Sequence, residues 1–112
     1  MSLSENAIKV LEKRYFAKDE NGNLLEDAEG MFRRVAKAVA EADLKYTTPD
    51  AVKDIENQFY DMMYNLEFLP NSPTLMNAGR PLGQLSACFV LPVEDSMEAI
   101  FEAIKNAALI HK

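Results

Sequence analysis

Apolar residues recur at helical spacing along most of this chain. They define four segments, at residues 3–15, 27–42, 49–66 and 96–110. The clearest series lies in the third segment, at positions three or four residues apart: Val52, Ile55, Phe59, Met62 and Leu66. This spacing places them on one face of a helix. Thr48 and Pro49 directly precede the series, and both residue types favour a helix start. The pattern predicts a largely helical protein.

Two shorter stretches lack this spacing and predict β structure. Residues 15–27 contain Asn21-Gly22, a pair that tolerates the positive φ angles of a tight turn, so we expect a β-hairpin there. Residues 85–93 form an almost continuous apolar run, which predicts a buried strand. A hairpin and one strand cannot complete a sheet, so this strand would need partners from elsewhere.

The expected fold class is therefore α+β, mainly α with a small β component. We expect two parts: residues 1–84, a helical N-terminal domain with the hairpin, and residues 85–112, a strand followed by the last helix. The last four residues carry no helix stop signal. We therefore expect the chain to be the front end of a larger unit.

Composition and charge narrow the possible functions. Of the 112 residues, 48% are apolar and 27% are charged, as in a globular domain. The net charge is −6, and the densest basic group, Arg33, Arg34 and Lys37, is expected on a solvated helix face, which argues against nucleic-acid binding. No apolar run reaches the roughly 20 residues of a membrane helix. The N-terminus also lacks the features of a signal peptide. We expect a cytoplasmic protein without membrane contact.

Cys88 is the only cysteine of the chain. Since there is also only one histidine, a zinc site of the chain's own would have too few soft ligands, and we expect no metal. The apolar neighbours of Cys88 favour a buried, inert thiol. No Lys, Arg or His lies beside it in the sequence to activate it.

Two polar clusters have both a structural and a functional interpretation. Ser72 and Pro73 fit the cap and first residue of a short helix, while Ser72 and Thr74 could also contact a phosphate or sugar. Asp95, before Ser96, fits the cap of the last helix, and an Asp at such a junction can also hold a ribose hydroxyl. The residues alone favour capping in both places.

Three ordered blocks resemble the N-terminal part of the ribonucleotide reductase large chain, with most likeness to the adenosylcobalamin-dependent class. The blocks are Pro70-Asn-Ser-Pro-Thr-Leu-Met-Asn-Ala-Gly79, Gln84-Leu-Ser-Ala-Cys-Phe-Val-Leu-Pro-Val93 and Asp95-Ser-Met-Glu-Ala-Ile100. Upstream, Arg14-Tyr-Phe16, the Asn-Gly turn and Met31-Phe-Arg-Arg-Val-Ala36 follow in the order of that family. The resemblance thus covers nearly the whole chain.

The resemblance implies a role for each cluster. The family reduces the 2′-carbon of a ribonucleotide with a cysteine thiyl radical inside a ten-stranded α/β barrel, while two further cysteines supply electrons and become a disulfide. By its Ser-Ala-Cys-Phe-Val context, Cys88 matches the first of that redox pair. The implied substrate-binding residues are Ser72, Pro73, Thr74 and Ala87. The implied effector-binding residues, at a dimer interface, are Asp95, Ser96 and Ile100.

The chain also departs from the family's pattern. It has no radical-forming cysteine, no Asn-x-Cys-x-Glu loop, no second redox cysteine and no glycine-rich segment after the last helix. Residues 1–84 would be the helical reductase domain, and residues 85–112 the first strand and helix of an incomplete barrel. We expect a ribonucleoside di- or triphosphate reductase that is catalytically incomplete in this chain alone.

Partners follow from the same resemblance. They are the rest of the catalytic chain, a ribonucleotide substrate, a deoxynucleotide effector and a second copy bound through the last helix. Adenosylcobalamin is expected for the full enzyme but not on this segment. The rival hypothesis is a non-catalytic nucleotide-binding or interaction module derived from the reductase front end.

Overall fold

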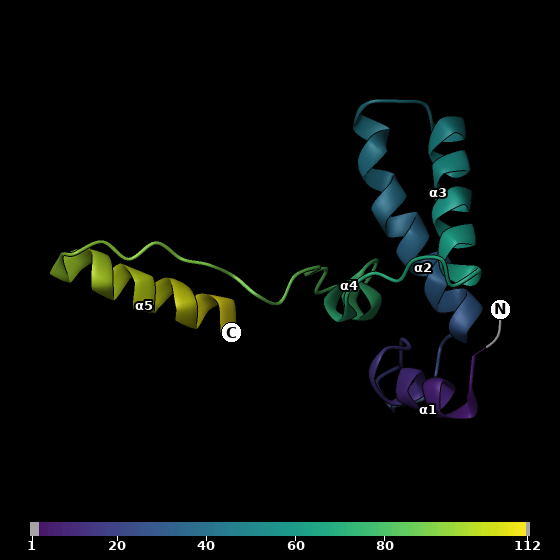
Figure 1. Ribbon diagram of the computed structural model, residues 1–112, viewed down its shortest axis with the longest axis horizontal. Helices are drawn as coiled ribbons and strands as arrows, with labels where there is room; N and C mark the ends of the chain where they lie inside the picture. Colours follow the sequence, from purple (N-terminus) through teal and green to yellow (C-terminus); the bar gives the residue numbers. More distant parts are fainter. Residues whose placement is uncertain (1–2, 112) are drawn as a thin grey trace.

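The computed structural model describes residues 3–111 and is built from helices. In chain order they are α1 (Glu5–Arg14), α2 (Ala28–Ala40), the 3-10 helix η1 (Glu41–Lys45), α3 (Pro49–Tyr64), α4 (Ser72–Asn77) and α5 (Met97–His111). Helices α2 and α3 lie side by side and antiparallel, with α1 near the start of α2 (Figure 1). The segment after α4 and helix α5 extend away from this group as an arm (Figure 1).

The core forms around one face of α2, as its apolar spacing predicts. Met31, Phe32 and Val35 are almost completely buried. They pack with residues from the 15–27 loop, α3 and α4, including Phe16, Met63, Leu75 and Ala78. Helix α4 is therefore attached to the core through Leu75 and Ala78, although it is only six residues long.

Side-chain caps fix the starts of the longer helices. The Thr48 hydroxyl accepts the N–H of Ala51 at 3.2 Å, with Pro49 as the first residue of α3. This confirms the helix start predicted there. Asp27 accepts the N–H of Gly30 at 2.8 Å and caps α2. Both side chains satisfy N–H groups that have no partner within the helix.

An ion-pair network joins α2 to α3. Glu56 is 5% exposed and accepts hydrogen bonds from Arg33 at 2.9 Å and Lys53 at 3.0 Å. The Arg33 guanidinium also lies 3.9 Å from the centre of the Tyr60 ring. Burial raises the pKa of Glu56, but the two cations outweigh burial and hold the pKa below its ordinary value of 4.5.

The predicted β-hairpin at residues 15–27 is wrong. One isolated antiparallel bridge, between Lys18 and Leu24, is all that forms there. The Asp19 carboxylate accepts the N–H groups of Asn21 at 2.9 Å and Asn23 at 2.8 Å. These bonds close the loop around a side chain, so the backbone groups do not extend the bridge into a ladder.

The predicted strand at residues 85–93 is also wrong, and with it the β part of the α+β assignment. The segment has an extended backbone but forms no strand. Val90, for example, is 98% exposed. An extended segment becomes a strand only when its N–H and C=O groups pair with a neighbour. Within residues 3–111 no neighbouring strand exists, and the described chain is all-helical.

Candidate functional site

Helix α4 carries the predicted substrate cluster, but its cap differs from the prediction. Asn71 is the N-cap, and its side-chain oxygen accepts the N–H of Thr74 at 3.1 Å. Ser72 and Pro73 are the first two helical residues, so the predicted cap at Ser72 is one residue too late. Asn is as good a cap as Ser, and Pro is tolerated within the first turn. The Ser72 hydroxyl is therefore not used for capping.

Both hydroxyls of the cluster bond to other parts of the chain. The Ser72 Oγ lies 2.8 Å from the Tyr15 hydroxyl. The Thr74 hydroxyl donates to the carbonyl of Leu85 at 3.1 Å. Asn77 adds a bond from its side-chain amide to the carbonyl of Gln84 at 2.9 Å. Helix α4 is thus tied at one end to the 15–27 loop and at its side to the start of the extended segment.

Arg34 lies at the centre of this arrangement. Its guanidinium pairs with Glu26, with the closest N–O distance at 2.7 Å, and the two side chains are only 13% and 10% exposed. Two other bonds reach the end of α4, to the carbonyls of Ala78 at 2.7 Å and Leu75 at 2.9 Å. The expectation of a solvated face is therefore wrong for Arg34. The side chain is shielded from most solvent because loop 15–27 and α4 both pack over it.

Gly79 ends α4 close to the same arginine. Its φ angle is +74°, a left-handed conformation that glycine adopts without steric cost. A Cβ atom at this position would lie 3.2 Å from the Cγ of Arg34. The end of α4 and the Arg34 side chain therefore fit closely.

Cys88 and Ala87 lie on the exposed extended segment. The prediction of a buried Cys88 is wrong for this chain, because the residue is exposed. Both residues line an open pocket of about 330 Å³ together with Ala107, Ile110 and His111 from the last turns of α5. The structure thus brings Cys88 beside α5. Ala87 lies two residues after Leu85, whose carbonyl accepts the hydrogen bond from Thr74.

The predicted effector residues lie at the start of α5. The Ser96 hydroxyl accepts the N–H of Ala99 at 3.1 Å, so Ser96 caps this end, where Asp95 was predicted to do so. Ile100 is 41% exposed. No residue of α5 within the described range is buried. Five of its large apolar side chains are exposed: Met97, Ile100, Phe101, Ile104 and Leu109.

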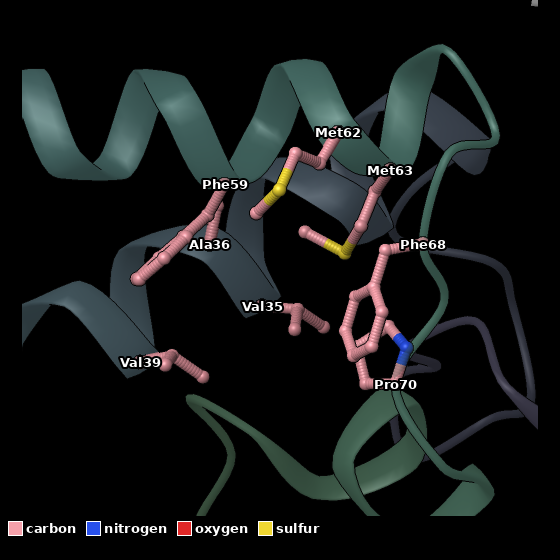
Figure 2. Close-up of a pocket in the computed structure, with 8 residues that line it drawn as sticks. All are labelled: Val35, Ala36, Val39, Phe59, Met62, Met63, Phe68 and Pro70. Carbon is pink, nitrogen blue, oxygen red and sulfur yellow. The ribbon is translucent and has the colours of Figure 1, made fainter.

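A separate apolar cavity of about 130 Å³ lies between α2, α3 and the turn after α3 (Figure 2). Figure 2 shows the side chains that surround it, among them Val35, Met62, Met63 and Phe68. No polar atom lines the cavity, so it offers nothing to bind a phosphate or a ribose. This cavity is therefore unsuited to a nucleotide.

Within residues 3–111, no group of three His, Cys, Asp or Glu side chains is arranged to hold a metal ion. Across the same residues, every helix is too short or too polar to cross a membrane.

Sequence reasoning missed several residues of the α4 site: Tyr15, Glu26, Arg34, Asn71 and Asn77. Asn71 had a local signal, because an Asn three residues before the N–H of Thr74 has the spacing of a cap. Tyr15 and Arg34 contact α4 from other parts of the chain, Glu26 acts through Arg34, and Asn77 bonds the carbonyl of Gln84 beyond α4. No local spacing in the sequence reveals these pairs.

Comparisons with known proteins agree on one family. The family described as "Ribonucleotide reductase, all-alpha domain" matches residues 1–83. The chain is 43% identical over 112 residues to a "Vitamin B12-dependent ribonucleoside-diphosphate reductase" of Mycobacterium tuberculosis, which covers 100% of this chain and 16% of the relative. A protein of the same name from Thermoplasma acidophilum is 39% identical over 166 residues, covering 100% of this chain and 22% of the relative.

More distant relatives carry related names. A "Ribonucleoside-diphosphate reductase large subunit" of Arabidopsis thaliana is 37% identical over 105 residues, covering 93% of this chain and 12% of the relative. The chain thus spans about a fifth or less of the length of these curated relatives.

Proposed function

The chain belongs to the ribonucleotide reductase family, and we propose that it serves as the N-terminal part of an enzyme that converts ribonucleoside diphosphates to deoxyribonucleotides. The observation that carries the proposal is the 43% identity to a vitamin B12-dependent reductase over all 112 residues. Because the match covers 16% of that relative, reduction requires the remainder of a large chain. The family match at residues 1–83 supports a domain boundary near residue 84. A reducing cytoplasm suits an enzyme that works through free thiols.

Ser72, Pro73, Thr74 and Ala87 form the proposed substrate contacts. In support, the Ser72 hydroxyl is exposed and not occupied by a cap. The bond from Thr74 to Leu85 holds the extended segment against α4. Ala87 lies only two residues after Leu85, so its main chain stays close to Thr74. Hydroxyls and main-chain groups from two segments could then contact one nucleotide.

Cys88 is the proposed donor of one reducing equivalent. In the proposed step, the ribose C2′–OH bond breaks, C2′ gains hydrogen and the oxygen leaves as water. The two electrons come from two thiols, Cys88 and a second cysteine outside this chain, which become one disulfide. This requires a free, accessible thiol, and Cys88 is exposed.

Helix α5 is the proposed contact with a second copy and with a deoxynucleotide effector, through Asp95, Ser96 and Ile100. In support, the described part of α5 buries no residue, although it carries five large exposed apolar side chains. An apolar helix face of this kind typically marks an interaction surface.

Adenosylcobalamin is the proposed cofactor of the complete enzyme, as the names of the relatives suggest. The residues described do not fit it. The apolar cavity between α2 and α3 holds about 130 Å³ and the open pocket beside Cys88 about 330 Å³. Sites for drug-sized ligands have about 300–1,000 Å³, and a cobalamin is larger than such ligands. We therefore place the cofactor on the remainder of the large chain.

A chimera tests the proposal. The 112-residue region of the Mycobacterium tuberculosis relative is replaced by this chain, and deoxynucleotide formation from a ribonucleoside diphosphate is measured with adenosylcobalamin and a dithiol. We expect activity in the chimera and none in the isolated chain. A folded but inactive chimera would favour the rival, a non-catalytic module. Reduction of a ribonucleoside diphosphate by the isolated chain would contradict the proposal that the rest of the large chain is required.

A further inference from the structure

We propose that Arg34 is the positioning residue that holds α4, and with it Ser72 and Thr74, in place for the substrate, and that Glu26 orients Arg34 for this task. The inference rests on the proposed function of α4. It adds two residues that lie outside the predicted substrate and effector clusters. Neither residue would touch the substrate, since Arg34 acts through the backbone of α4 and Glu26 acts through Arg34.

The contacts of Arg34 use all three guanidinium nitrogens. Nε and Nη2 face the Glu26 carboxylate, at 3.1 Å and 2.7 Å. Nη1 donates to the carbonyl of Ala78, and Nη2 also donates to that of Leu75. Only the planar fork of an arginine can reach a carboxylate and two carbonyls at once, because a lysine offers a single nitrogen.

These bonds satisfy backbone groups that would otherwise be unpaired. The last carbonyls of a helix have no partner within the helix. Leu75 and Ala78 belong to the core, so water cannot easily replace a lost donor. A cation at this end also suits the helix dipole. Helix α4 has only six residues, so an anchor at its end also fixes Ser72 and Thr74.

Glu26 connects this anchor to the loop before α2. Its carboxylate accepts the N–H of Ala17 at 2.9 Å as well as the Arg34 bonds. The same loop region supplies Tyr15, whose hydroxyl lies 2.8 Å from that of Ser72. Glu26 thus ties Arg34, the support at the end of α4, to Ala17. Arg34 itself also donates to the Tyr15 carbonyl at 3.4 Å, so the two supports of α4 meet at this arginine.

Arg33 provides a matched control. It precedes Arg34 in α2 and also pairs with a buried glutamate, Glu56. Its bonds run to α3, however, and not to α4. Arg33→Gln and Arg34→Gln therefore both remove an ion pair with a buried carboxylate, but only Arg34→Gln removes contacts with α4.

Amide hydrogen exchange of the 112-residue chain is the test, followed at Leu75 in α4 and Ala78 directly after it, with α2 amides as the internal reference because both arginines lie in α2. Relative to α2, we expect Arg34→Gln to speed exchange at Leu75 and Ala78 at least about tenfold, which corresponds to about 1.4 kcal/mol. Arg33→Gln, whose lost contacts lie in α3, should leave this ratio unchanged. Arg34→Lys keeps the charge and should still speed α4 exchange. Equal ratios in the two glutamine variants, or full rescue by lysine, would overturn the inference.

Titration with cytidine diphosphate, followed by amide chemical shifts, tests the substrate contacts at Ser72 and Thr74 separately from the role of Arg34 in holding α4. In the unchanged chain we expect shifts at Ser72 and Thr74, with Arg34→Gln weakening the apparent Kd at least about tenfold more than Arg33→Gln. Equal weakening by both would contradict a positioning role. If the unchanged chain shows no shifts, the proposed substrate contacts fail, and the exchange ratios still decide whether Arg34 anchors α4.

Discussion

Replacing Gly79 by alanine tests how closely α4 fits against Arg34, and Gly22 provides the control. Both glycines have left-handed φ angles, +74° and +83°. An alanine in this conformation costs about 1–2 kcal/mol, and the stiffer unfolded chain offsets about 0.4–1 kcal/mol. At Gly22 a Cβ atom would meet nothing within 4 Å. We therefore expect Gly22→Ala to lower the free energy of unfolding by about 1 kcal/mol.

At Gly79, an alanine would cause a close side-chain contact as well as the backbone strain. The new Cβ would lie 3.2 Å from the Cγ of Arg34. Arg34 cannot move aside freely, because Glu26 and two α4 carbonyls hold its guanidinium. Overpacking of this kind costs about 1–3 kcal/mol. Gly79→Ala should therefore lower the free energy of unfolding by about 2–4 kcal/mol in total. Urea denaturation of the three proteins measures both losses. Equal losses for the two variants would refute a rigid contact between Gly79 and Arg34.

Other predictions concern the core, the ion pair and the thiol. Phe32 is 2% exposed, so Phe32→Ala should lower the free energy of unfolding, measured in urea, by about 3–5 kcal/mol. A loss under about 1 kcal/mol would contradict the place of Phe32 in the core. Because its folded pKa is lowered, Glu56 stabilises the fold fully above about pH 4.5, and this contribution disappears as pH falls through the folded pKa. The stability difference between the unchanged chain and Glu56→Gln should therefore shrink towards acid pH in urea titrations, and a constant difference would be inconsistent with the network. Cys88→Ser should change stability by less than about 0.5 kcal/mol; iodoacetamide should modify the native thiol as fast as that of an unstructured peptide, and strong protection would indicate burial.

The helices could be predicted from the sequence because their signals are local. Thr48-Pro49 starts α3 as expected, and the apolar spacing of α2 identifies the core face that buries Phe32. The two β predictions failed for different reasons. At Asn21-Gly22, the Asp19 side chain took the N–H groups that a longer ladder would use. At residues 85–93, apolar composition predicts burial, but burial depends on a partner that the described chain does not contain.

The candidate site shows the same limit. Ser72 and Thr74 stand out in the sequence because they belong to a contiguous motif, and their role as substrate contacts stays a prediction. The sequence places Arg34 on a solvated face, since charge is usually exposed and its partner Glu26 lies on another element eight residues earlier. Cys88 was expected to be buried from its apolar neighbours, yet the thiol is exposed. Long-range pairs of this kind have no periodicity that a single sequence reveals.

The most direct test of the central claim, that this chain supplies one of the two reducing thiols of a reductase, follows Cys88 during turnover. The chimera described above is reduced, freed of dithiol and given substrate and adenosylcobalamin, and its cysteine peptides are then identified by mass spectrometry. We predict that Cys88 becomes disulfide-linked in proportion to the deoxynucleotide formed, and that Cys88→Ser abolishes product. Deoxynucleotide formation with Cys88 still a free thiol would contradict the claim.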